Sequence, residues 1–244
     1  MNYLFLAQSD LIENPASVSP SEFAAVLSSD RAREALKDHD LKAGLSISCV
    51  IENLGSGKVT IGACHPEKIE MTVTIQEALP ARLPLDLVVA YSRPQTLKKL
   101  LQLSASVGLR SLSFVKTANV VPSYLQSKSL EPDQICRQFI LGCEQAGDGV
   151  FPQLNQFKNF HEFIKSPMVL ESKGQKLFGE SASKVDICAA SKETLLFLGP
   201  ESGFTLEEKN ILYKSGFMPA SLGPRMLRVE IAAAMLIGVI SQKT

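Results

Sequence analysis

The sequence lacks an excess of positive charge, a long apolar run and a signal peptide pattern. Its 25 lysines and arginines are balanced by 25 aspartates and glutamates, so the formal net charge is zero and bulk charge alone could not hold a nucleic acid. The longest apolar stretch, residues 231–240, is about half of the twenty residues that a membrane span needs. The first eleven residues carry no basic segment before a long apolar run, which argues against a signal peptide. We therefore expect a cytoplasmic protein without a membrane segment.

Cysteines are few and are not arranged as metal or disulfide motifs. There are five, an odd number, at scattered spacings and without a CxxC pair. This pattern predicts reduced and mostly buried thiols. The neighbours Cys64 and His65 lack a second pair of ligands, so we predict no metal site.

The N-terminal part is rich in short strand-like runs. Residues 46–51 and 58–61 flank Asn53-Leu-Gly-Ser-Gly57, which is typical of a hairpin, and residues 71–75 alternate as a strand does. A charged segment, residues 29–42, could form one helix. These features predict a small β-rich module over residues 1–76, with the fold of a partial barrel.

After Pro80 the pattern changes to alternating strands and helices, and the segment from Pro80 to Pro84 is the natural linker. The apolar runs 85–91, 112–115 and 194–198 are typical of strands buried on both faces. Apolar positions at helical spacing predict helices over 94–107 and 131–146. The sequence therefore predicts an α/β domain over residues 77–244, with a mostly parallel sheet.

Two Gly-Pro loops stand out in this second part. Gly199-Pro-Glu-Ser-Gly-Phe204 follows the strand 194–198 and leads into Thr205-Leu-Glu-Glu208, a capping box that starts a helix. Gly223-Pro-Arg-Met-Leu-Arg228 precedes a second, very apolar helix. Loops at the carboxyl ends of such strands bind ligands, and stiff loops with exposed backbone groups suit a flat heterocycle such as adenine. Neither loop is a phosphate-binding loop, and two ordinary strand–helix turns remain an alternative.

The paired sequences LGPESGFTLEE (198–208) and SLGPRMLRVEIAAA (221–234) resemble the signature of the RsmE family. These are methyltransferases of the SPOUT superfamily that modify uridine N3 in small-subunit (16S) ribosomal RNA. Weaker likeness at residues 43–47, 94–109 and 142–146 extends the resemblance over nearly the whole chain.

The resemblance implies a fold, a methyl donor and partners. Residues 77–244 would form a SPOUT-type α/β domain with a deep trefoil knot, and residues 1–76 a PUA-like β-barrel that binds RNA. S-adenosylmethionine would be the methyl donor, and ribosomal RNA or the small ribosomal subunit the partner. The active unit would be a homodimer formed through the knotted domain. The expected donor-binding residues are Phe197, Leu198, Gly199, Pro200, Glu201, Gly203, Ser221, Leu222, Gly223, Met226 and Leu227.

Arg228 and Glu230 are the candidate catalytic residues. A uridine N3 nucleophile must lose its proton, so the site needs a base or a cation that stabilises the developing anion. Arg228 could instead cap a helix or pair with a carboxylate, and Glu230 could be a first-turn carboxylate favoured by the helix dipole.

The motifs also depart from the usual family pattern. Ser202 replaces a glycine, Ile231 replaces a threonine, and Asp148 stands where the family usually has an arginine. Two other hypotheses therefore stay open. One is a knotted protein that binds RNA or ribosomes without methylating them, and the other is a methyltransferase with a different RNA target.

Overall fold

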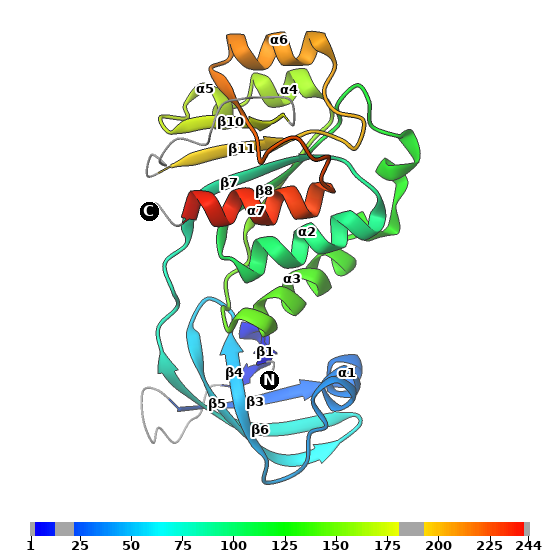
Figure 1. The fold of residues 1–244 in the computed structure, drawn as a ribbon. Helices are drawn as coiled ribbons and strands as arrows, with labels where there is room; N and C mark the ends of the chain where they lie inside the picture. Colours follow the sequence, from blue (N-terminus) through cyan, green and yellow to red (C-terminus); the bar gives the residue numbers. More distant parts are fainter. Residues whose placement is uncertain (1–2, 13–21, 181–192, 242–244) are drawn as a thin grey trace. The chain divides into compact units, whose positions relative to one another are not determined.

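The computed structural model describes residues 3–12, 22–180 and 193–241, and it divides the chain into two compact units (Figure 1). Unit 1 comprises residues 1–81 and 140–151, and unit 2 comprises residues 82–139 and 152–244. The chain first passes from one unit to the other between Ala81 and Arg82, inside the expected Pro80–Pro84 linker. Its return to unit 1 at residues 140–151 was not foreseen from the sequence.

Contacts with the N-terminal strand explain why residues 140–151 belong to unit 1. The backbone N–H of Tyr3 donates to the Glu144 carbonyl at 2.9 Å, and the N–H of Phe5 donates to the Glu144 carboxylate at 3.2 Å. The ring of Phe5 stacks on Phe151 with 5.4 Å between centroids. The partners are far apart in sequence, so no local pattern could indicate these contacts.

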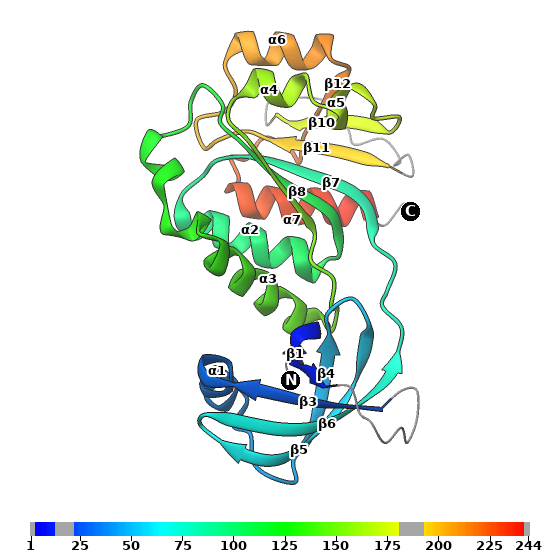
Figure 2. The ribbon, with the colours of Figure 1, turned by 180° about the vertical axis from the view of Figure 1, so that it is seen from behind.

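Unit 1 is built on one mixed sheet. In the described residues its strand order is β1-β4-β5-β6-β3-β2, with β1 parallel to β4 and the other pairs antiparallel. Helix α1 (Ser29–His39) packs against β3 and β6 (Figure 2). The predicted hairpin, the strand near 71–75 and the charged helix are all confirmed. The strands are β1 (Leu4–Leu6), β2 (Leu11–Ile12), β3 (Glu22–Ser28), β4 (Ser46–Ile51), β5 (Gly55–His65) and β6 (Lys68–Glu77).

Unit 2 contains a parallel sheet, which confirms the predicted α/β class. Within the described ranges the strand order is β12-β10-β11-β7-β8-β9, and every neighbouring pair is parallel. The strands are β7 (Leu83–Ala90), β8 (Leu109–Val115), β9 (Gln153–Phe157), β10 (Gln175–Gly179), β11 (Thr194–Leu198) and β12 (Phe217–Ala220). Parallel strands place their carboxyl ends along the same edge of the sheet.

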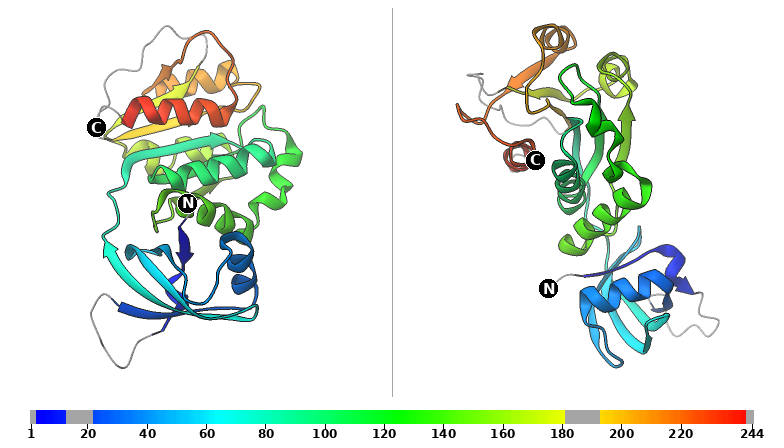
Figure 3. Two further views of the ribbon diagram at one scale, coloured as in Figure 1. Left: turned by 60° about the horizontal axis from the view of Figure 1, so that its bottom comes forward. Right: turned by 90° about the vertical axis from the view of Figure 1, so that its right-hand side faces the viewer.

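Helices cover both faces of this sheet (Figure 3). Helices α2 and α7 contact each other on one face, and an aromatic core that includes Phe163, Phe197 and Phe217 lies on the other. The helices are α2 (Pro94–Ser106), α3 (Pro132–Ala146), α4 (Phe160–Ile164), α5 (Pro167–Leu170), α6 (Leu206–Lys214) and α7 (Val229–Ser241), and short 3-10 turns η1 (Gln8–Asp10), η2 (Pro122–Gln126) and η3 (Lys128–Leu130) complete the elements. None of the described helices is long and apolar enough to cross a bilayer.

Two details differ from the sequence prediction. Pro84 lies inside β7, at a register shift between Leu83 and Asp86, where a proline is tolerated because the ladder is irregular. Among the described cysteines, Cys49 and Cys143 are buried and Cys64 is half-buried, but Cys136 is exposed. Helix α3 therefore turns Cys136 away from the core; Cys188 lies outside the described residues.

Candidate functional site

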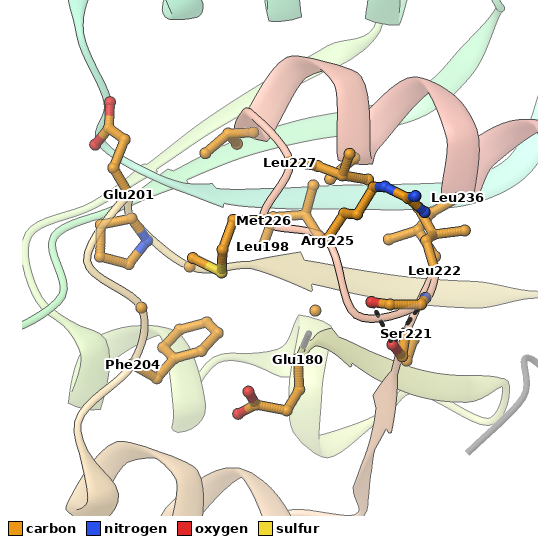
Figure 4. Close-up of a pocket in the computed structure, with 18 of the residues that line it drawn as sticks. Glu180, Leu198, Glu201, Phe204, Ser221, Leu222, Arg225, Met226, Leu227 and Leu236 are labelled. Carbon is orange, nitrogen blue, oxygen red and sulfur yellow. Dashed lines mark hydrogen bonds between the residues drawn. The ribbon is translucent and has the colours of Figure 1, made fainter. Parts of the chain in front are cut away.

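A cavity opens where three neighbouring strands of unit 2 end. Strands β12, β10 and β11 are adjacent in the sheet, and the segments that follow them surround the cavity (Figure 4). Its lining residues are Gly179, Glu180, Leu198, Gly199, Pro200, Glu201, Gly203, Phe204, Lys209, Ala220, Ser221, Leu222, Gly223, Arg225, Met226, Leu227, Val229, Ala232 and Leu236. The two Gly-Pro loops thus meet at one place, as expected for a ligand site at strand carboxyl ends.

Ten of the eleven predicted donor-binding residues line this cavity, and Phe197 does not. The Phe197 side chain is fully buried in the aromatic core, with its ring centroid 4.9 Å from that of Phe163 and 4.8 Å from that of Phe204. Side chains alternate along a strand, so Phe197 and Leu198 point to opposite faces of β11. The donor-binding role of all eleven stays a prediction.

The loop after β11 is fixed by a turn and by contacts with the segment after β8. The N–H of Gly203 donates to the Pro200 carbonyl at 2.8 Å, and Gly203 has φ +75°, which favours glycine. The Asn119 amide donates to the Gly203 carbonyl at 2.9 Å, and the Ser202 hydroxyl donates to the Asn119 carbonyl at 3.3 Å. The serine that departs from the family pattern therefore helps to anchor this loop.

Glu208 links the same two segments. Its carboxylate accepts from the Thr205 N–H at 2.9 Å and from the Ala118 N–H at 2.8 Å, while the Thr205 hydroxyl accepts from the Glu208 N–H at 3.2 Å. The predicted capping box is confirmed, and the bond to Ala118 is an addition that the sequence did not reveal. Glu208 is 5% exposed, and the two backbone bonds that its carboxylate accepts are partly buried.

The loop after β12 is more open. The Ser221 hydroxyl accepts from the Gly223 N–H at 3.2 Å, and Gly223 has φ +98°. Arg225 lines the cavity, whereas Arg228 is exposed and is not part of the lining. Met226 is 78% exposed, although its side chain also borders the cavity.

Glu230 lies in the first turn of α7 and pairs with Lys99 of α2. One carboxylate oxygen is 3.0 Å from the Lys99 Nζ, and the other is buried without a hydrogen-bond partner among the described residues. Burial raises the pKa of Glu230, but the backbone N–H of Glu230, Lys99 and Arg228 together hold that pKa below its ordinary value. Glu230 does not line the cavity, and an ionised carboxylate with a low pKa is a weak base.

Arg93 adds a positive charge beside the cavity. Arg93, the residue before α2, lies with its Nε 3.9 Å from the carboxylate of Glu201. A hydrogen bond with Tyr124, and then the charge of Glu201, raise the pKa of Arg93. The rim therefore carries a permanent positive charge next to a lining residue.

Sequence reasoning missed part of the lining. Gly179 and Glu180 follow β10, a strand that was not predicted because polar residues, Gln175 and Lys176, fill its first half. Lys209, in the first half of α6, forms an ion pair with Glu180. The only sequence signal was the apolar pair Leu177 and Phe178 before Gly179, which is too brief to distinguish a strand from a loop.

Comparisons with known proteins agree on one family. The family model described as "RNA methyltransferase domain" matches residues 79–241. The ribosomal RNA small subunit methyltransferase E of Treponema pallidum (strain Nichols) is 30% identical over 166 residues, covering 66% of this chain and 62% of the relative. The ribosomal RNA small subunit methyltransferase E 1 of Borreliella burgdorferi is 27% identical over 150 residues, covering 61% and 63%. The chain thus matches less than two thirds of the length of these curated relatives.

Solved structures show the same fold over nearly the whole chain. The ribosomal RNA small subunit methyltransferase E of Neisseria gonorrhoeae, solved with S-adenosylmethionine, aligns with a TM-score of 0.78 at 19% identity, covering 99% of this chain and 97% of that one. A methyltransferase from Legionella pneumophila, solved with the same cofactor, aligns with a TM-score of 0.79 at 22% identity, covering 99% and 98%.

Proposed function

Because the chain belongs to the RNA methyltransferase domain family, we propose that it transfers a methyl group from S-adenosylmethionine to ribosomal RNA. One observation carries the proposal. The two Gly-Pro loops, which carry the family signature, converge on a single cavity at the carboxyl ends of adjacent parallel strands. The names of the curated relatives support ribosomal RNA of the small subunit as the substrate. The resemblance of the two Gly-Pro motifs to the RsmE family supports N3 of a uridine as the target atom.

The cavity fits the proposed donor in its chemistry. S-adenosylmethionine, when bound, supplies a methyl group on a sulfonium. Leu198, Met226 and Leu227 give the cavity apolar walls, and Gly203 and Gly223 hold the loop backbones in conformations that a side chain would strain. Apolar walls with exposed backbone donors and acceptors suit an adenine ring.

For the substrate we assign different roles to the two candidate catalytic residues. Arg228 is exposed beside the cavity, so it is free to reach an RNA base and to stabilise the negative charge that develops when N3 loses its proton. Glu230 is held by Lys99, and its low pKa makes it a poor proton acceptor. Glu230 therefore acts as a positioning residue, which fixes the start of α7 and attracts the Arg228 charge.

We also propose the finer architecture that the resemblance implies. The likeness of fold to known relatives supports a deep trefoil knot in residues 77–244 and a PUA-like β-barrel that binds RNA in residues 1–76. A homodimer is supported by four exposed apolar side chains on α7 and the loop before it. These are Met226, Leu227, Ile231 and Met235. A second copy of the chain would cover this surface. We place the protein in the cytoplasm, where its ribosomal substrate would be found.

The departure at Asp148 has a local explanation. Asp148 is buried, its N–H donates to the Cys143 carbonyl at 3.3 Å, and its carboxylate accepts from the Val150 N–H at 3.1 Å. The aspartate therefore shapes the turn after α3. This departure from the family pattern therefore does not argue against methyl transfer.

The test combines donor binding with product analysis. Calorimetry should show binding of S-adenosylmethionine, and the protein should methylate small subunits from a strain that lacks its gene. Mass mapping of the nucleosides should find N3-methyluridine. Absence of donor binding would end the proposal. RNA binding without methyl transfer would support the binding-protein hypothesis, and a different modified nucleoside would identify another target.

A further inference from the structure

Glu180 occupies the centre of the three strand ends that form the cavity. It follows β10 directly, and β10 lies between β12 and β11 in the sheet. The Glu180 N–H donates to the Ala220 carbonyl at 2.9 Å, which extends the pairing of β10 with β12 by one residue. A Cβ on the preceding Gly179 would lie 2.8 Å from the Leu198 side chain, so the backbone of β10 is packed tightly against β11 here.

The Glu180 carboxylate is oriented by one partner. Lys209 of α6 forms an ion pair with its Oε2, and the Glu180 side chain is 19% exposed. In Figure 4 this carboxylate lies across the cavity from Met226. A carboxylate offers about four acceptor sites on its two oxygens. Within the described part of the chain, Lys209 is the partner of Glu180, so most of this acceptor capacity remains for a ligand.

The charge of the pair decides which ligand group suits it. Glu180 and Lys209 together are neutral, and a second cation near the carboxylate would be repelled by Lys209. Neutral hydroxyl donors meet no such repulsion, and a hydrogen bond to an ionised acceptor is stronger than one to a neutral acceptor. The pair therefore suits a diol better than an ammonium group.

We propose that Glu180 binds the ribose hydroxyls of the donor nucleoside, so that the cavity selects a ribonucleoside over its deoxy form. This inference rests on the proposed function, because it assumes that the ligand is S-adenosylmethionine. An acidic side chain at the carboxyl end of a parallel strand serves the same purpose in dinucleotide-binding folds. A site that hydrogen-bonds a hydroxyl disfavours the ligand that lacks it, because the acceptor sites that Lys209 leaves open then lose their partner.

The test compares two proteins with three ligands by calorimetry. The ligands are S-adenosylhomocysteine and its 2′-deoxy and 3′-deoxy forms, and the proteins are the wild type and Glu180→Ala. The wild type should bind at least one deoxy form about tenfold more weakly than the parent. Glu180→Ala should bind the parent about tenfold more weakly and should no longer distinguish it from the deoxy forms.

A matched control is available on α6. Glu207 is exposed and does not line the cavity, so Glu207→Ala should keep the discrimination of the wild type. Circular dichroism melts of both variants check that they are folded. Discrimination that survives in folded Glu180→Ala would overturn the inference and leave the proposed function intact. A wild type that binds neither parent nor deoxy ligand would instead overturn the proposed function.

Discussion

Replacing Glu208 by alanine should destabilise unit 2 and loosen the donor site together. The substitution removes the acceptor of two backbone N–H groups, those of Ala118 and Thr205. Hydrogen bonds to charged groups contribute about 1.5–3 kcal/mol each. Water can reach the two donors after truncation, because both bonds are only partly buried. We therefore expect a loss of about 1–1.5 kcal/mol for each bond and roughly 2–3 kcal/mol in total.

A chain of this length loses about 2–4 °C in melting temperature per kcal/mol, so Glu208→Ala should melt roughly 5–10 °C below the wild type. The chain contains no tryptophan, so circular dichroism is the suitable probe. The affinity for S-adenosylmethionine should also fall, because Glu208 links the donor loop to the segment after β8. Glu207→Ala, one residue away and exposed, is the control. If Glu208→Ala had the same melting temperature as the control and bound the donor with wild-type affinity, the assigned role of this carboxylate would be wrong.

Three further predictions concern the loop after β12 and the start of α7. Arg228→Ala should lower the methyl-transfer rate by about a hundredfold and leave donor affinity unchanged, and a rate near the wild type would remove Arg228 from the mechanism. The pKa of Glu230 is lowered from 4.5, so its stabilising contribution is complete above that pH and is lost as the pH falls through the folded value. Below that pH, the free energy of unfolding should therefore depend less on pH in Glu230→Gln than in the wild type. Lys99→Met should be less stable than the double variant Lys99→Met/Glu230→Gln, because the double variant leaves no unpaired charge. Gly223→Ala strains a backbone with φ +98° by about 1–2 kcal/mol and should weaken donor binding, whereas Gly44→Ala, at φ +81° in unit 1, should cost similar stability without affecting the donor.

Local patterns in the sequence predicted most of the elements around the site. Leu195 to Leu198 is an unbroken apolar run, and together with Thr194 it forms a strand that is buried along its whole length. Thr205 and Glu208 stand at the spacing of a capping box, and they make both of its bonds. In each case the signal depends on neighbours within a few residues, and backbone geometry turns such spacing directly into structure.

Other parts of the site depend on contacts between distant segments. Strand β10 inserts between β11 and β12, although it precedes both in the chain. That order brings Glu180 to the cavity and pairs it with Lys209. This strand order could not be predicted from a five-residue strand whose first two residues are polar.

The sequence by itself determined that two stiff Gly-Pro loops follow apolar segments and precede helices, because glycine, proline and capping residues act through their own backbone. The tertiary structure decided which side chains those loops present. It turned Phe197 into the core, tied Glu230 to Lys99, and placed Arg225 rather than Arg228 in the lining of the cavity. The reason is physical: the direction of a side chain at a loop or helix start is fixed by what packs against it. Here those neighbours come from strands and helices far away in the sequence.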